Sequence, residues 1–313
     1  MVRDTDTTAW PPAASVLDWL LDSDPSIRWQ VLQDLVDVDN VAAERARVAD
    51  EGWGRRLLDE QRPDGQWGDG EAHPFWWTNL YTLLYLRDLG VDPESDRTRH
   101  AIELVHSSVT WGPWHGDSPF FEGEEEPCIN GRVVALGAYF GKPRLRLVDL
   151  LLSEQLGDGG WNCEAFRGSV RSSFHTTICV LEGLLAHEQS FGEDPAITEA
   201  RERGEEYLLE RHLLRRLSTG GVIDEGWRRL AFPPLWHYDV LRGLEYAVTA
   251  GLEDDPRLAE AIETVASRQL PDGRWRLDVR HKDTLYEEIA GAPGEPNRWI
   301  TLRALRALKR LRQ

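Results

Sequence analysis

The segment Gln155-Leu-Gly-Asp-Gly-Gly-Trp161 decides the fold, because the phrase Q-x-x-D-G-x-W recurs along the chain. Two further complete copies span Gln61–Trp67 and Gln269–Trp275, and degenerate copies end at Trp114 and Trp227. Steps of 47 residues join Trp67 to Trp114 and Trp114 to Trp161, and a step of 48 residues joins Trp227 to Trp275. The step from Trp161 to Trp227 is 66 residues and requires an insertion. A period of a few tens of residues indicates tandem supersecondary units that bury a common core by stacking.

Each copy of the phrase lies between two helical patterns. The stretch before it, for example 53–60 or 145–154, has leucines at three- and four-residue spacing. The Asp-Gly pair ends that helix, because glycine tolerates the left-handed conformation of a C-terminal turn. After a loop a second helix begins, rich in small and apolar residues on several faces, and we expect these second helices to form an inner row. Their predicted ranges are 79–86, 131–138, 175–184, 237–244 and 299–308.

The predicted fold class is therefore all-α, an α/α toroid of about six tandem helix hairpins with inner and outer rings. We expect a single domain over residues 1–313, with an N-terminal helix pair at 12–50 and the repeats at 51–313. Hairpins that curl until the last one meets the first would leave no end of the array exposed. Runs of alternating polarity with β-branched residues are nearly absent, which argues against strands.

Charge and composition exclude some classes of partner. The chain has 36 basic and 54 acidic residues and a formal net charge of −18, which repels nucleic acids and anionic membrane surfaces. No apolar run approaches the roughly 20 residues that cross a bilayer, and residues 1–10 do not read as an export signal. We therefore expect a cytoplasmic protein without an integral membrane segment. Its three cysteines, Cys128, Cys163 and Cys179, form no CxxC pair and are expected to be reduced thiols.

The recurring phrase resembles the repeat of the squalene and oxidosqualene cyclases and, more distantly, that of the protein prenyltransferase β subunits, over residues 50–311. The resemblance implies a central cavity that binds an isoprenoid among apolar and aromatic side chains near the inner-helix N-termini. Cyclases that protonate an alkene have a D-x-D-D-T segment at the place that corresponds to residues 124–130, and no D-x-D-D occurs in this chain. Squalene-type cyclisation is therefore not expected, because protonating a carbon–carbon double bond needs an unusually strong, positioned acid.

The prenyltransferase resemblance also implies a zinc site. That family holds zinc with a carboxylate and a cysteine two residues apart at one inner-helix start and a histidine at the next. Glu126, Cys128 and His175 are the matching residues, with glutamate in place of aspartate, and Cys163 is an alternative to Glu126. Three such ligands with one open position are typical of catalytic zinc. The competing interpretations are buried thiols that act as small hydrophobes, and magnesium at the acidic run 122–126, which also reads as a solvated loop.

Further candidate residues lie at or just before predicted inner-helix starts. His237 and Asp239 are the catalytic candidates, as acid or base or as extra metal ligands, although a carboxylate there is also an ordinary helix N-terminal residue. Aromatic faces can stabilise carbocations and arginines can bind a diphosphate, whereas packing and salt bridges are the competing explanations. The substrate-binding candidates of these two kinds are Trp76, Trp77, Arg132, Arg171, Phe174, Trp236 and Tyr238.

Two classes of function remain. The first is a terpenoid cyclase- or prenyltransferase-like enzyme that acts, with zinc assistance, on an isoprenoid or other apolar substrate in the cavity. The second is a non-enzymatic toroid that binds a lipid or a protein partner through its rim loops. A zinc toroid that works on peptide thiols, similar to the lanthionine cyclases, ranks last because their motifs are absent. The prenyltransferase resemblance also allows for a partner subunit.

Overall fold

The computed structural model describes residues 11–312, and the chain divides into two compact units. The central unit is Ala42–Tyr207. The terminal unit combines the chain up to Val41 with the chain from Leu208 onward. The prediction of one domain over 1–313 stays a prediction, and the expected lack of an export signal in residues 1–10 lies outside the described residues.

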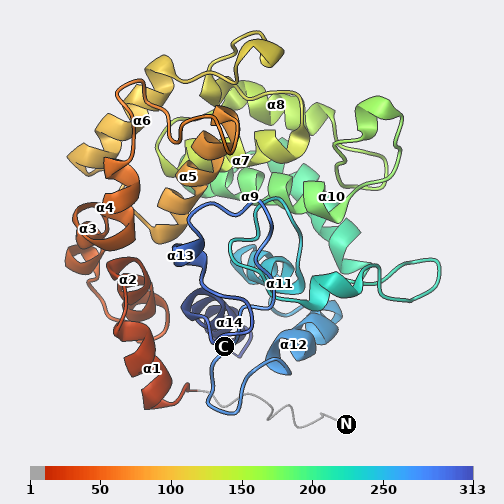
Figure 1. The fold of residues 1–313 in the computed structure, drawn as a ribbon. Helices are drawn as coiled ribbons and strands as arrows, with labels where there is room; N and C mark the ends of the chain where they lie inside the picture. The colour runs from red at the N-terminus through yellow and green to blue at the C-terminus, as the bar shows by residue number, and fades with distance from the viewer. Residues whose placement is uncertain (1–10, 313) are drawn as a thin grey trace. The chain divides into compact units, whose positions relative to one another are not determined.

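The helices of the central unit follow the predicted pairs (Figure 1). They are α3 (Ala42–Asp50), α4 (Gly52–Asp59), α5 (Phe75–Leu89), α6 (Asp96–Ser108), α7 (Pro127–Tyr139), α8 (Leu145–Ser153), α9 (Phe174–Phe191) and α10 (Pro195–Leu209), whose last residues belong to the terminal unit. Three short 3-10 helices lie in the loops: η1 (Pro113–His115), η2 (Phe120–Glu122) and η3 (Ala165–Arg167).

The terminal unit contains helices from both ends of the chain. They are α1 (Ala14–Leu21), α2 (Pro25–Asp34), α11 (Val240–Thr249), α12 (Ala259–Ala266), α13 (Glu287–Ala290) and α14 (Arg298–Arg310), with the 3-10 helices η4 (Glu225–Arg228) and η5 (Pro256–Leu258). Between residues 11 and 312 there is no β-strand, only isolated bridges. The predicted fold class, all-α with tandem helix hairpins, is confirmed.

The repeated phrase forms a fixed set of hydrogen bonds between successive helices. The Trp161 indole N–H donates to the Leu151 carbonyl of the preceding outer helix, 2.7 Å away. The Trp161 backbone N–H donates to Thr177 Oγ1 of the following inner helix at 3.0 Å. The Gln155 amide donates to the Ala200 carbonyl of the next outer helix at 2.7 Å. The same bonds recur for Trp67 with Leu57 and Asn79, for Trp275 with Val265 and Thr301, and for Gln61 with Ala101.

One degenerate copy of the phrase is placed differently from the prediction. Trp114, at the 47-residue spacing, is 95% exposed, whereas Trp111 is buried. The indole of Trp111 donates to the Phe120 carbonyl at 2.8 Å and stacks on the Phe120 ring. Pro113 begins η1 directly after Gly112, and this turn carries Trp114 outward. Trp111 therefore takes the buried place, and the spacing of Trp114 does not mark a core position.

The inner helices of the central unit are buried on nearly every face. Helix α7 lies between α5 and α9 and packs most closely on α9. A Cβ atom added to Gly183 of α9 would lie 2.1 Å from the carbonyl oxygen of Gly131 in α7. A Cβ atom added to Gly131 would lie 2.5 Å from the carbonyl oxygen of Cys179. The two helices therefore meet backbone to backbone, which fixes where the N-terminus of α7 stands.

In the terminal unit the last helix packs on the first hairpin. Arg306 of α14 lies 2.8 Å from the Asp34 carboxylate and donates to Gln30 Oε1 at 2.6 Å, both in α2. Lys309 pairs with Asp37 at 2.5 Å. The two ends of the repeat array are thus neighbours within this unit, as the hairpin count predicts.

The inner-helix starts are displaced by a few residues from the predicted ones. Helix α5 begins at Phe75 and α7 at Pro127, so both start earlier than expected. Helix α11 begins only at Val240, because the Asp239 side chain caps it, and residues 210–239 contain no α-helix. This irregular stretch belongs to the insertion that the 66-residue step requires.

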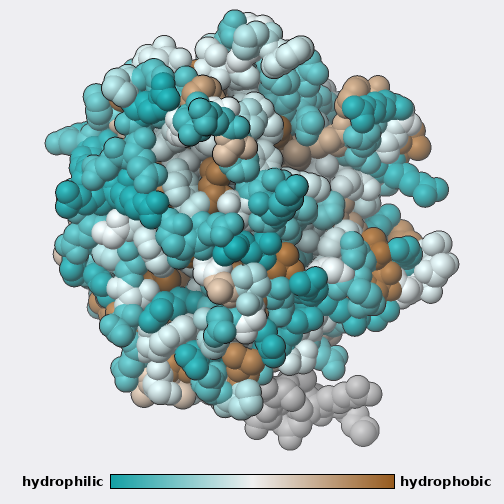
Figure 2. Space-filling model, in the orientation of Figure 1, coloured by the Kyte–Doolittle hydropathy of each residue, from teal (hydrophilic) through white to brown (hydrophobic). Residues whose placement is uncertain are grey.

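The surface agrees with the acidic composition. Hydrophilic residues cover most of the face shown in Figure 2, with hydrophobic residues scattered among them. Within residues 11–312, no helix has both the length and the apolar character that a membrane span requires.

Candidate functional site

A carboxylate and two thiols come together where α7 begins. Pro127 occupies the first turn of the helix and Glu126 is the N-cap residue. The potential ligand atoms of Glu126, Cys128 and Cys163 all lie within 4.8 Å of one another. Cys128 Sγ is 3.7 Å from Glu126 Oε2, and both thiols are half-buried. We call these three residues the thiol cluster.

The first turn of α9 fixes the third member of the cluster. Cys163 lies in the loop between Trp161 and α9, so the order of secondary structure alone does not place it. The Thr176 hydroxyl donates to Cys163 Sγ at 3.5 Å, and the Cys163 backbone N–H donates to Thr176 Oγ1 at 3.3 Å. The buried Thr176 thus holds the Cys163 thiol against the N-terminus of α7.

The two thiols differ in acidity because they are hydrogen-bonded to each other. The hydrogen bond to Cys163, together with burial, raises the pKa of Cys128 far above its usual range. The hydrogen bond from Cys128 lowers the pKa of Cys163, and the Thr176 hydroxyl acts in the same direction. The first proton lost from the pair therefore leaves a thiolate on Cys163.

Aromatic side chains form a row beside the cluster. The ring centroids of Trp77 and Tyr81 are 4.3 Å apart, those of Trp76 and Trp77 5.5 Å, and those of Trp76 and Trp111 6.3 Å. Arg132, which is only 2% exposed, donates to the Tyr81 hydroxyl at 2.6 Å. We call Trp111, Trp76, Trp77 and Tyr81 the aromatic row. Its Tyr81 end lies within electrostatic reach of the thiol cluster, since Arg132, which donates to Tyr81, opposes the rise in the pKa of Cys128.

Three other predicted residues of the central unit lie outside this arrangement. His175 is half-buried in the first turn of α9, and the group of potential ligand atoms found among residues 11–312 does not include it. Phe174 is buried against the Tyr207 ring, with centroids 5.4 Å apart. Arg171 is exposed, and its backbone carbonyl accepts a hydrogen bond from the Asn162 side chain at 2.6 Å.

The acidic run 122–126 is spread over separate contacts. The Glu124 side chain is only 4% exposed and accepts the Glu126 backbone N–H at 2.7 Å, and burial raises the pKa of Glu124. Glu122 pairs with Arg146 at 3.4 Å, whereas Glu125 points to solvent. Of this run only Glu126 joins the ligand group in the described part of the chain, so a magnesium site here stays a prediction.

In the terminal unit, two predicted residues and a third, unpredicted one form a stack of three rings. His237 lies between Trp236 and His281, with centroid distances of 3.8 Å and 3.7 Å and interplanar angles of 26° and 11°. Trp236 is 39% exposed and forms the outer face of the stack. His281 comes from the loop before α13, where no sequence motif marked it.

The other two candidates beside His237 have structural partners. Asp239 is 4% exposed and caps α11 by accepting the backbone N–H groups of Arg242 at 2.9 Å and Ala231 at 3.2 Å. Burial raises the pKa of this carboxyl. The Tyr238 hydroxyl is buried and donates to the Leu213 carbonyl at 2.9 Å. The competing interpretation of Asp239, an ordinary helix N-terminal residue, therefore accounts for its contacts, and its catalytic assignment stays a prediction.

His281 makes the stability of the protein depend on pH. Burial, with a smaller contribution from Arg242, lowers its pKa from 6.5 to about 4. Between pH 6.5 and about pH 4, His281 therefore binds a proton in the unfolded chain but not in the folded chain. The free energy of unfolding accordingly falls as the pH falls through this window.

We expect the free energy of unfolding of His281→Phe, measured by urea unfolding, to fall less between pH 7 and pH 5 than that of the wild type. Phenylalanine keeps the ring stack and does not titrate. His100→Gln, at an exposed position on α6, is the control. Equal slopes in His281→Phe and wild type would contradict this assignment.

Comparison with known proteins adds likenesses of fold. No protein-family model matches the chain, and no curated protein does. The type II terpene cyclase MstE from Scytonema is 18% identical with a TM-score of 0.46, covering 91% of this chain and 85% of that one. A protein from Actinoplanes is 17% identical with a TM-score of 0.46, covering 96% and 99%. A glycosyl hydrolase of family 88 from Bacteroides vulgatus is 14% identical with a TM-score of 0.47, covering 95% and 90%. The named activities belong to those proteins.

Proposed function

We propose that this protein is an enzyme in which the thiol cluster holds zinc and an apolar, isoprenoid-type substrate lies against the aromatic row. The observation that carries the proposal is the convergence of the Glu126, Cys128 and Cys163 ligand atoms within 4.8 Å. Two of these residues stand at the start of α7 and the third stands in the loop before α9. Metal-ligating groups from two separate segments come together by chance less often than neighbours within a single helical turn.

The donor set fits zinc. Zinc binds thiolate sulfur at about 2.3 Å and carboxylate oxygen at about 2.1 Å, so ligand atoms around a tetrahedral ion lie within about 4 Å of one another. Two sulfurs and one oxygen would leave the fourth position for a water or a substrate thiol. When bound in such a site, zinc lowers the pKa of that fourth ligand and supplies a nucleophile at neutral pH.

The protein groups around the cluster would orient its members. The N-terminal end of α7 carries partial positive charge, which opposes the rise in the pKa of Cys128 that its hydrogen bond with Cys163 and its burial produce. The Thr176 hydroxyl donates to Cys163 Sγ and fixes the direction of that side chain. Arg132, buried on the Tyr81 side, presents a positive charge that favours an anionic leaving group near Cys128.

The aromatic row supplies the apolar contact. Trp76 and Trp77 are half-buried at the start of α5 and so remain open to a ligand, whereas Trp111 and Tyr81 are buried behind them. Ring faces attract a developing carbocation by about 0.5 to 2 kcal/mol. An allylic, isoprenoid-type substrate is the class that uses both an aromatic wall and an activated nucleophile.

Metal content tests the proposal. We expect about one zinc per chain in protein purified without a histidine tag, measured by elemental mass spectrometry, as for a single catalytic site. Cys128→Ala and Cys163→Ala should each lower the zinc content at least tenfold, because removing one of three ligands destroys the site. Cys179→Ala is the matched control, since this buried thiol lies outside the ligand group and should leave zinc in place.

The remaining outcomes are also informative. If His175→Ala also loses zinc, His175 is the fourth ligand. If His175→Ala retains zinc, the fourth coordination position is open for substrate. Zinc-free wild-type protein, or equal zinc in all variants, would overturn the zinc centre. Product formation from prenyl diphosphates and thiols, followed by mass spectrometry, then tests the substrate class separately.

The second candidate is a binding role without chemistry, and exposed apolar side chains on the loops of the central unit favour it. Trp114 is 95% exposed, Phe166 77% and Val170 79%, which is unusual for residues of this size. A lipid or a protein partner would cover such side chains. Wild-type protein that contains no zinc but binds an apolar ligand would support this candidate.

A further inference from the structure

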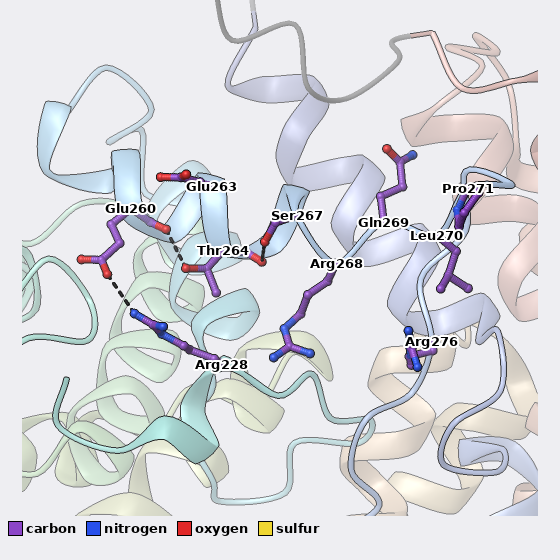
Figure 3. Close-up of a pocket in the computed structure, with 10 residues that line it drawn as sticks. All are labelled: Arg228, Glu260, Glu263, Thr264, Ser267, Arg268, Gln269, Leu270, Pro271 and Arg276. Carbon is purple, nitrogen blue, oxygen red and sulfur yellow. Dashed lines mark hydrogen bonds and ion pairs between the residues drawn. The ribbon is translucent and has the colours of Figure 1, made fainter.

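The terminal unit contains a polar groove that is separate from the thiol cluster of the central unit. Its volume is about 680 Å³, within the usual range for small-molecule sites. Helix α12 and the turn after it form one side, η4 contributes Arg228, and the chain beyond Trp275 contributes Arg276 (Figure 3). Most of its lining is polar or charged, including Arg228, Glu260, Glu263, Arg268 and Arg276, so polar contacts would hold a ligand here.

The turn of the third complete copy has a different helix neighbour from the turns of the other two. In the two earlier complete copies the motif glutamine donates to an outer-helix carbonyl, that of Ala101 in α6 and of Ala200 in α10. Both helices begin five residues before that carbonyl. In the third copy Gly273 faces Val16 of α1, but α1 begins only at Ala14. Among the described residues from 11 onward, α1 therefore places only its first turn beside the motif turn, whereas α6 and α10 place a later turn there.

Arg268 and Arg276 keep side-chain donors that no described residue uses, and a third arginine, Arg228, lies beside them. Arg276 is exposed and makes no side-chain hydrogen bond or ion pair with any residue in the range 11–312. Arg268 donates from Nη1 to Asp278 at 2.8 Å, which leaves its Nε and Nη2 without a protein partner in that range. Arg228 Nε is buried without a hydrogen-bond partner. Figure 3 shows Arg268 between Arg228 and Arg276.

Carboxylates pair with Arg268 and Arg228 but, within residues 11–312, not with Arg276. Glu260 is held by Arg215, with Nε to Oε2 at 2.8 Å and Nη2 to Oε1 at 2.5 Å, and shares Oε1 with Arg228 at 3.2 Å. The hydrogen bond from Arg215 lowers the pKa of Glu260, so one ionised carboxylate serves two guanidinium groups. Glu263 is exposed, and Figure 3 shows its carboxylate pointing away from the three guanidiniums.

We propose that this groove binds the phosphate or diphosphate group of a small hydrophilic molecule through Arg268 and Arg276, with Arg228 at its edge. Guanidinium groups match phosphoryl oxygens in bidentate pairs, which suits donors that stand free in a cavity. The walls offer only Leu270 and Pro271 as apolar contacts, so the rest of the ligand is polar. This ligand differs from the apolar substrate proposed for the central unit, and the inference does not depend on that proposal.

Isothermal titration of the full chain with inorganic diphosphate tests the site, with inorganic phosphate and sodium chloride of equal ionic strength as comparisons. Low salt is needed because about 0.15 M salt screens charges beyond roughly 8 Å. We expect saturable binding of diphosphate that weakens at least tenfold in both Arg268→Ala and Arg276→Ala. Arg55→Ala, an exposed arginine on α4 of the central unit, is the matched control and should bind like the wild type.

Glu263→Gln adds a variant that should not disturb folding, because Glu263 is exposed and pairs with no arginine of the groove. It removes a negative charge near the groove and should bind diphosphate at least as tightly as the wild type. Absence of saturable diphosphate binding would overturn the proposal, as would wild-type affinity in both arginine variants. Binding that sodium chloride of equal ionic strength abolishes would show nonspecific attraction only and would also overturn it.

Discussion

Replacing Trp161 with alanine should lower the free energy of unfolding by about 4 kcal/mol, which is typical for deletion of a buried aromatic side chain. The Trp161 ring is fully buried between the outer and inner helices of its hairpin. Its loss leaves a cavity and removes the donor to the carbonyl of Leu151, a buried residue in the last turn of α8. Urea unfolding monitored by circular dichroism would measure the difference.

The chain provides a matched control for this substitution. Trp114→Ala removes the same side chain from the degenerate copy, but this tryptophan is 95% exposed. The change in stability should stay within about 0.5 kcal/mol. Trp161→Phe should fall between the two, because one six-membered ring is kept while the hydrogen bond, at about 1 to 3 kcal/mol, and part of the buried volume are lost. Equal effects of the two alanine substitutions would contradict the structural distinction between the copies.

The complete copies of the repeat predict the fold because each residue in them has one physical task. The predicted helix-ending role of Asp-Gly is wrong, because α8 already ends at Ser153, and Asp158 and Gly159 belong to the turn that follows. The Trp161 indole binds one carbonyl of the outer helix, and the Gln155 amide reaches the next outer helix. The same reasoning fails for Trp114, since spacing alone does not say which of two nearby tryptophans turns inward. The turn at Pro113 makes that choice, and turn geometry is a weaker signal in sequence than helical periodicity.

The candidate site was predictable only in part. Glu126 and Cys128 share one helix start, so their proximity follows from sequence. The third potential ligand atom near them is that of Cys163, the predicted alternative, because Thr176 holds the loop before α9, and a metal-binding role of His175 stays a prediction. His281 was missed for the same reason: it reaches His237 from a long irregular loop that carries no periodic pattern. Contacts made by loops depend on tertiary packing, which residue spacing does not encode.

The contact between α7 and α9 is the second feature on which stability should depend strongly. Gly183→Ala should lower the free energy of unfolding by about 3 kcal/mol, at the upper end of the range for overpacking. The added Cβ would lie 2.1 Å from the Gly131 carbonyl oxygen, and a helix backbone cannot yield as a flexible side chain can. Alanine favours helix over glycine by about 1 kcal/mol, so a destabilised variant would show that the steric effect exceeds the propensity gain.

The same substitution links the fold to the proposed function. If α7 moves away from α9, then Glu126 and Cys128 move away from Cys163, which α9 holds through Thr176. We therefore expect Gly183→Ala to lose zinc at a temperature where it is still folded, measured by elemental analysis beside circular dichroism. Gly157→Ala is the control, since a Cβ there meets nothing within 4 Å, and it should keep both stability and zinc. If Gly183→Ala is as stable as the wild type, α7 and α9 can separate freely. If Gly183→Ala is destabilised but retains zinc, the thiol cluster does not depend on the contact between α7 and α9.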